Sequence, residues 1–156
     1  MEIHLERAGL KDAETIWRMQ IKAFQKLLDR YQDFATNPAS EPLEKVQARL
    51  EQESTYYYFI CLENGEKAGA IRVVDPKTPG EKKRIAPLFI LPDYENRGFA
   101  QQAIRLCEKL HGQRDWSLST LLQEEKNCYL YEKMGYRATG ALEKVNDRLT
   151  LVFYEK

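Results

Sequence analysis

Apolar and polar positions divide the first third of the chain into one strand and two helices. Residues 2–8 alternate between apolar and polar side chains, which predicts a strand. Asp12 stands where a helix would begin, and apolar residues then recur at helical spacing as far as Tyr31. Two X–Pro steps interrupt this pattern between residues 36 and 42, and a short helix is expected to start near Leu43.

The remaining pattern predicts a meander of strands followed by alternating helices and strands. Asn64-Gly65 separates two apolar runs and is the strongest hairpin signal in the chain, and Gly112 and Gly135 are placed to end helices. We expect strands at 55–62, 67–74, 83–91 and 115–120, helices at 98–111 and 126–134, and a final hairpin of strands 136–145 and 148–154. With the first three elements this order gives an α+β domain on a mixed sheet of about seven strands with about four helices.

Pro87 lies inside the expected strand 83–91. Because proline has no N–H to donate, it is confined to edge strands and bulges. If this strand is central, Pro87 marks a bulge, which leaves nearby main-chain groups free to bind a ligand. The alternative is that 83–91 is simply an edge strand.

Composition narrows the class of protein. The 156 residues suggest one domain, and 24 basic against 24 acidic side chains give zero net charge, which disfavours attraction to nucleic acid or an anionic membrane. No apolar stretch approaches the roughly 20 residues of a membrane span, and the first residues lack the apolar region of a signal peptide. Cys61, Cys107 and Cys128 fit neither a disulfide framework nor a CxxC metal pair, so we expect buried or half-buried thiols in a cytoplasmic protein.

The turn after strand 83–91 is the one place where the main chain itself has the features of a binding site. A polar turn leads to Gly98-Phe99-Ala100, where a helical pattern begins. Free N–H groups at a helix start suit an anion, above all a phosphate. The GxxxxGK sequence of a Walker loop is absent, and the preceding antiparallel meander is the wrong setting for a Rossmann turn. These residues alone therefore predict a generic anion site.

Two segments resemble motifs of the GNAT superfamily of N-acetyltransferases. Ile90-Leu91-Pro92 and Glu95-Asn96-Arg97-Gly98-Phe99-Ala100 are similar to the family's acetyl-CoA motif, a hydrophobic-x-Pro step and Gln/Arg-x-x-Gly-x-Gly/Ala before a helix. Asn127-Cys128-Tyr129-Leu130-Tyr131-Glu132-Lys133-Met134-Gly135-Tyr136 is similar to the family's helix ending in Tyr-Glu-Lys-x-Gly-Phe/Tyr. The chain departs from the family at Glu95, where Gln or Arg is usual, and at Asn127, which precedes Tyr131 by four residues instead of seven. The likeness covers essentially the whole chain and implies a GNAT-like domain over residues 1–156, with a mostly antiparallel sheet.

The resemblance implies direct transfer of an acetyl group from acetyl-CoA to a primary amine of a small molecule or peptide, without a metal. It implies two catalytic groups, the main-chain N–H of Ile90 as oxyanion donor and the hydroxyl of Tyr131 as general acid. The cosubstrate-binding residues that it implies are Phe89, Ile90, Leu91, Glu95, Asn96, Arg97, Gly98, Phe99, Ala100, Asn127 and Tyr131. We expect the carboxylate of Glu95 to point away from the pyrophosphate, so that only its N–H contributes.

Several alternatives stay open at this point. Tyr131 is one of nine tyrosines and could be an aromatic of the core, and within Tyr56-Tyr57-Tyr58-Phe59 core packing is favoured over an acceptor pocket. Glu124, Glu125 or a chain of waters could take the proton of the amine. The other functional reading is a GNAT-fold acyl-CoA sensor or interaction module without turnover. The acceptor is not named by the sequence, and a homodimer through the edge of the C-terminal hairpin is one option.

Overall fold

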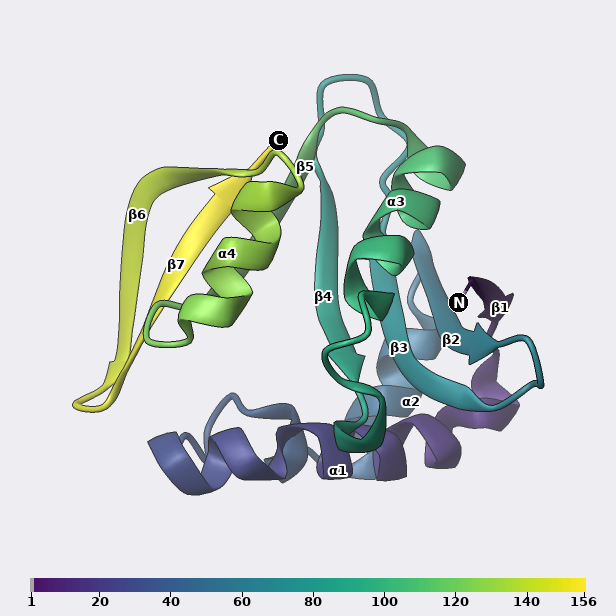
Figure 1. Ribbon diagram of the computed structural model, residues 1–156, viewed down its shortest axis with the longest axis horizontal. Coiled ribbons are helices and arrows are strands. Elements are labelled where there is room, and N and C mark those ends of the chain that lie inside the picture. The colour runs from purple at the N-terminus through teal and green to yellow at the C-terminus, as the bar shows by residue number, and fades with distance from the viewer. Residues whose placement is uncertain (1) are drawn as a thin grey trace.

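The computed structural model describes residues 2–156 as a seven-stranded sheet with helices packed around it (Figure 1). The strands are β1 (Ile3–Arg7), β2 (Thr55–Leu62), β3 (Lys67–Val74), β4 (Lys83–Ile90), β5 (Trp116–Leu121), β6 (Arg137–Asn146) and β7 (Leu149–Glu155). The helices are α1 (Ala13–Tyr31), α2 (Leu43–Glu51), α3 (Phe99–His111) and α4 (Glu125–Lys133), and short 3₁₀ helices cover Leu10–Asp12, Pro38–Ser40 and Pro92–Tyr94. The predicted α+β class, strand number and helix number are confirmed.

The strand order is β1-β2-β3-β4-β5-β7-β6, and every neighbouring pair is antiparallel except β4 and β5. The Asn64-Gly65 hairpin joins β2 to β3 as predicted. The last hairpin is inserted so that β7 lies between β5 and β6. β6 is therefore an edge of the sheet, and dimer formation through it stays a prediction.

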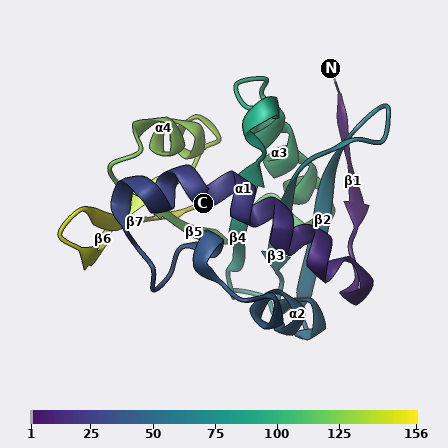
Figure 2. The ribbon, with the colours of Figure 1, turned by 90° about the horizontal axis from the view of Figure 1, so that it is seen from below.

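Helices cover both faces of the sheet, α1 and α2 on one face and α3 and α4 on the other. Seen from below, α1 runs across the middle with α3 and α4 on one side of it and α2 on the other (Figure 2). The alternation predicted for β2 is confirmed, because Tyr58 packs in the core beneath α3 and α4 while Tyr57 and Phe59 pack in the core beneath α1 and α2. Core packing was thus the correct expectation for these rings.

The start of α1, the state of the cysteines and the search for a membrane-spanning helix each test an expectation from the sequence. α1 begins after Asp12 as predicted, but the Asp12 carboxylate accepts the Gly9 N–H at 2.9 Å instead of capping α1. Cys61 and Cys107 are buried, Cys128 is half-buried, and all three are free thiols, as expected. Among the described residues, no helix combines the length and the hydropathy of a membrane span.

A bulge interrupts β4 at the predicted proline. The register of β3 against β4 shifts between Ile71 and Val73, opposite the cis peptide bond Ala86–Pro87. Arg72 lies at this point on β3, and its Nε donates a hydrogen bond to the carbonyl of Ala86. The bulge is confirmed, and the edge-strand alternative is wrong, because β4 is the central strand of the sheet.

β4 and β5 separate soon after they meet. They pair only through Lys83 with Trp116 and Arg84 with Ser117, and then diverge downward in Figure 1. β5 pairs with β7 along its length, so the edge of β4 that faces β5 has no strand partner from residue 85 to residue 90. We call this divergence the splay.

Candidate functional site

The main chain of β4 is open toward the splay. The N–H of Leu91 donates to the carbonyl of Ala68 at 2.8 Å, and the direction of N–H groups alternates along a strand, so the N–H of Ile90 turns away from β3. A Cβ on Gly69, the partner of Ile90, would lie 2.1 Å from the carbonyl oxygen of Phe89. Glycine at position 69 thus lets β3 approach β4 closely where the Ile90 N–H faces the splay.

Side chains at the end of β4 pack into the protein core. Phe89 is 5% exposed and meets Phe24 of α1 edge-to-face, with ring centroids 5.8 Å apart. Leu91 packs in the same core beneath α1 and α2, while Ile90 packs against the core beneath α3 and α4. A ligand in the splay would therefore meet residues 89–91 through their main-chain groups.

The turn that follows β4 ends at the start of α3. Gly98 has φ +79°, a conformation that suits glycine, and the Phe99 side chain next to it is 2% exposed. The first α3 N–H to find an acceptor is that of Gln102, which donates to the carbonyl of Gly98 at 3.2 Å. Within residues 2–156 the N–H groups of residues 96–100 have no hydrogen-bond acceptor, and they lie at the positive end of the helix. The free N–H groups lie in the turn where the sequence predicted an anion site, and binding of an anion there stays a prediction.

Glu95 differs from the residues that follow it. Its N–H donates to the carbonyl of Pro92 across a long 3.4 Å contact within the turn. Its side chain is exposed, and its carboxylate has no hydrogen bond or ion pair among the described residues. The sequence predicted that the Glu95 N–H contributes to pyrophosphate binding. This N–H is thus partly engaged within the turn itself.

Charged side chains surround the turn. The Arg97 guanidinium lies 5.6 Å from the centroid of the Tyr94 ring and donates to the carbonyl of Asp93 at 3.1 Å. Lys126, from the first turn of α4, donates to the side-chain oxygen of Asn96. Lys126 therefore brings a cation from α4 to the free N–H groups, and sequence reasoning missed it because only the folded chain joins these two segments.

Tyr131 lies on α4 with its ring in the core. The ring centroid is 6.0 Å from that of Tyr136 and 6.2 Å from that of Tyr154, and the residue is 8% exposed. It shares the core beneath α3 and α4 with Ile90. Its hydroxyl has no hydrogen-bond partner in the described part of the chain, and burial raises its pKa well above the usual tyrosine range, so it keeps its proton at neutral pH.

The start of α4 holds Glu124 and Glu125, the two acidic residues that the sequence offered as bases. Glu125 is exposed and Glu124 is half-buried. Asn127 is half-buried, and its N–H donates to the carbonyl of Glu124 at 3.0 Å. Glu124 occupies the position seven residues before Tyr131, where the family motif has asparagine. Its Oε2 accepts the hydroxyl of Tyr31 at 2.5 Å and the guanidinium of Arg30 at 2.7 Å. These contacts tie the end of α1 to the start of α4.

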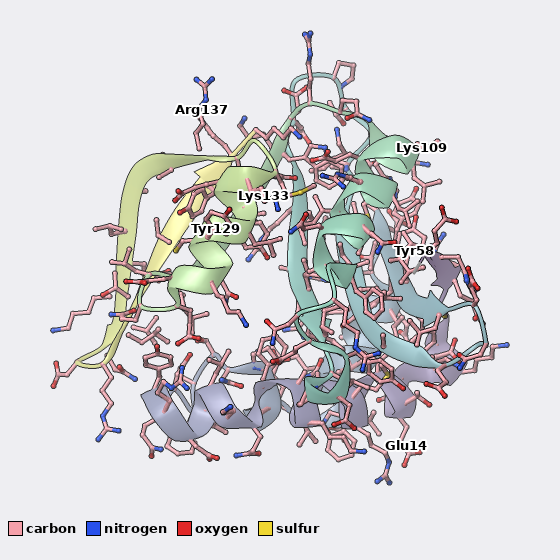
Figure 3. All side chains as sticks on the ribbon, in the orientation of Figure 1. Glu14, Tyr58, Lys109, Tyr129, Lys133 and Arg137 are labelled. Atoms are coloured by element: carbon pink, nitrogen blue, oxygen red, sulfur yellow. The ribbon has the colours of Figure 1, made fainter. Side chains whose placement is uncertain are left out.

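Surface hollows lie at the other end of α3. One of about 430 Å³ is lined by four basic side chains, Arg105, Lys109, Lys133 and Lys156. Figure 3 labels two of them, Lys109 and Lys133, at the upper parts of α3 and α4. A second hollow of about 300 Å³ includes His111 at the end of α3. Neither includes the turn at Gly98 or the residues of the splay.

A central strand with an open edge thus leads directly into a helix start with free N–H groups. The sequence matches the model of the Acetyltransferase (GNAT) family over residues 22–136. The chain belongs to the GNAT acetyltransferase family. A search of curated proteins finds no match.

Three solved structures with a similar fold are acetyltransferases of low sequence identity to this chain. An acetyltransferase from Thermus thermophilus has a TM-score of 0.70 at 19% identity, covering 99% of this chain and 96% of its own. Spermidine N-acetyltransferase from Vibrio cholerae, in complex with CoA and spermine, has a TM-score of 0.76 at 13% identity, covering 97% and 93%. The microcin self-immunity acetyltransferase MccE, in complex with acetyl-CoA and AMP, has a TM-score of 0.73 at 17% identity, covering 99% and 92%. At these identities the likeness shows the fold.

Proposed function

We propose that residues 1–156 act as a single acetyl-CoA-dependent domain that transfers an acetyl group to a primary amine by direct attack in a ternary complex. The observation that carries this proposal is the β4 edge, which has no strand partner after Arg84 and continues into the free N–H groups of the turn. Complexes of two structurally similar acetyltransferases with CoA or acetyl-CoA support the choice of cosubstrate. The three free thiols suit a reducing compartment such as the cytoplasm.

The cosubstrate would be held mainly by main-chain groups. In this proposal the N–H groups of residues 96–100 bind the pyrophosphate, Gly98 permits close approach, and Lys126 adds a positive charge beside Asn96. The amides of the pantetheine arm pair with residues 89–91 as an added strand would. The side chain of Asn127, half-buried in the first turn of α4, is assigned to the same arm.

The acyl transfer needs one donor for the oxyanion and one acid. The amine nitrogen attacks the thioester carbonyl carbon, and the N–H of Ile90 stabilises the negative charge on its oxygen, an effect of about 3 kcal/mol for a well-placed donor. The carbon–sulfur bond then breaks, and the leaving thiolate takes the proton of the Tyr131 hydroxyl. That hydroxyl suits the role because it is protonated at neutral pH and has no other partner among the described residues.

The amine must lose a proton before it attacks. The Oε2 atom of Glu124 already accepts two hydrogen bonds, from Arg30 and Tyr31, so we assign Glu124 to joining α1 with α4. We assign removal of the proton from the amine to water. Glu124→Gln should accordingly leave the pH at which the rate rises unchanged, because the assigned route does not titrate this carboxylate.

Release of free CoA thiol tests the function directly. Saturating acetyl-CoA is mixed with a panel of amines that includes spermidine, spermine, a peptide with a free α-amine and a lysine peptide, and mass spectrometry identifies the acetylated product. We expect release of CoA with at least one class of amine. Binding of acetyl-CoA by calorimetry without release for any amine would instead favour a GNAT-fold sensor.

A further inference from the structure

Three possible metal ligands meet at the edge of the sheet formed by β1 and β2. His4 and Glu6 belong to β1, and Cys61 of β2 is the register partner of His4. Alternate residues of a strand share a face, so His4, Glu6 and Cys61 lie on one face of this edge. One ligand atom from each side chain lies within 4.8 Å of those of the other two.

This cluster is separate from the proposed acetyl-transfer site. Cys61 packs in the core beneath α1 and α2, whereas Ile90 and Tyr131 lie in the core beneath α3 and α4. β1 is the outermost strand of the sheet and lies at the far side of it from β5 and α4 (Figure 1). No step of acetyl transfer calls on these three residues.

The thiol of Cys61 already interacts with one of the other two groups. Its Sγ donates to Oε2 of Glu6 at 3.5 Å, and burial raises its pKa to about 11. His4 and Glu6 are exposed, so a metal ion in solution can reach the cluster from their side. A bound cation would take the place of the thiol proton that now lies between sulfur and carboxylate.

We propose that His4, Glu6 and Cys61 bind a zinc ion, with water as the fourth ligand. Imidazole, thiolate and carboxylate are the ligands that zinc prefers, whereas magnesium and calcium take oxygen ligands. The thiolate and the carboxylate balance the two positive charges of zinc. The complex is therefore neutral, so it does not repel the nearby ammonium of Lys67, the β3 partner of Cys61. The ion would fasten the edge strand β1 to β2.

Metal binding by the tag-free full chain tests this site without any assay of acetyl transfer. After treatment with a chelator, the protein is titrated with zinc in competition with a chromophoric chelator, and with cobalt as a spectroscopic substitute. We expect one metal per chain, and with cobalt a thiolate-to-metal charge-transfer band. Affinity should fall at lower pH, because zinc must displace the thiol proton. Absence of 1:1 binding overturns the proposal.

Three variants decide whether these residues are the ligands. His4→Gln alters an exposed side chain and leaves the core intact, and Cys61→Ser removes the thiolate. Each should weaken zinc binding by about 100-fold or more, because even the loss of an outer-shell partner costs 10- to 100-fold. Cys128→Ser is the matched control at a half-buried thiol and should bind as the parent does. Unchanged affinity in His4→Gln, or loss of the cobalt band in Cys128→Ser, overturns the assignment.

Thermal unfolding gives a second readout. Zinc that binds only the folded chain should raise Tm in proportion to the logarithm of its free concentration. The rise should be present in the parent and in Cys128→Ser and absent in His4→Gln. An equal rise in His4→Gln would place the metal elsewhere.

Discussion

β4 and β5 are neighbours in the sheet, yet they and the elements that follow them present different groups to the splay. β4 is followed by the turn and α3, and β5 is followed by α4. On the β4 side, the N–H of Ile90 and the N–H groups of residues 96–100 are open while the neighbouring side chain of Phe89 is buried. On the β5 side, α4 brings the side chains of Lys126 and Tyr131. One half offers main chain and the other offers side chains.

The bulge in β4 and the elements that follow the two strands account for this difference. β4 loses its β5 partner after Arg84 and carries a bulge at Pro87 against β3, so some of its main-chain groups stay unpaired. β5 pairs with β7 without a register shift, its edge toward β4 is also open after Ser117, and it is followed by α4. Activity should therefore respond to backbone geometry on the β4 side and to side-chain chemistry on the α4 side.

The largest effect is expected for Tyr131→Phe. The variant keeps the ring in the core and removes only the hydroxyl, so kcat should fall by about 10²- to 10⁴-fold while the Kd for acetyl-CoA changes little. Steady-state kinetics and calorimetry measure the two quantities. Tyr129→Phe, two positions away on α4 and 66% exposed, is the control and should match the parent (Figure 3). Equal kcat for Tyr131→Phe and parent would remove this side chain from the mechanism.

The pH dependence of kcat sharpens the same assignment. Burial raises the pKa of Tyr131 above its ordinary value, so the acid form persists beyond the pH, about 10, at which a free tyrosine ionises. In the parent, kcat should therefore show no loss caused by this group below pH 10. A decline centred below that pH and absent from Tyr131→Phe would mean that the hydroxyl is more acidic than its burial implies.

The second effect tests the backbone half and comes from Gly69→Ala. The new Cβ would lie 2.1 Å from the carbonyl oxygen of Phe89, so β4 must shift beside the N–H of Ile90. Overpacking of this kind should lower the free energy of unfolding by about 1–3 kcal/mol. kcat should fall as well, by up to the roughly 10²-fold that loss of an oxyanion donor causes.

Gly9→Ala is the matched control for that substitution. A Cβ at position 9 meets nothing within 4 Å, and the residue has φ −124°, which any residue adopts. Denaturant unfolding and kcat should both stay near the parent values. If Gly69→Ala behaves as Gly9→Ala does, the geometry of β4 is not what limits the reaction.

A smaller effect is expected for Lys126→Ala. Removing an exposed cation beside the turn should raise the Kd for acetyl-CoA by about two- to fivefold, and the difference should shrink as salt is added. Calorimetry at two salt concentrations measures it. Lys133→Ala, at the other end of α4, removes the same charge from the basic hollow and should leave Kd unchanged.

Local signals in the sequence predicted most of the fold. Asn64-Gly65, Gly112 and Gly135 fixed the ends of elements because each turn or helix end depends on a few adjacent residues. The short pairing of β4 with β5 and the insertion of β7 between β5 and β6 were not predicted. They depend on contacts between distant segments, which no local pattern encodes.

The same division holds for the candidate site. Gly98 and Tyr131 were found from the short motifs in which they lie. The hydrogen bonds of Lys126 with Asn96, and of Glu124 with Arg30 and Tyr31, join residues 30 to 94 positions apart. In each case the partner is set by the packing of α4 beside another element, so the sequence alone leaves it undetermined.

The smallest effect should come from Glu95→Gln, and it tests the main-chain half most directly. The Glu95 carboxylate is exposed and has no hydrogen bond or ion pair among the described residues, and the substitution leaves the turn's main chain in place. The Kd for acetyl-CoA should therefore change by less than about twofold. Gly98→Ala in the same turn is the contrast. A Cβ there meets nothing within 4 Å, but φ +79° strains alanine and shifts the N–H groups, so Kd should rise clearly. If Glu95→Gln strengthens binding severalfold while Gly98→Ala does not weaken it, side-chain charge governs this turn and the contrast between the two halves is wrong.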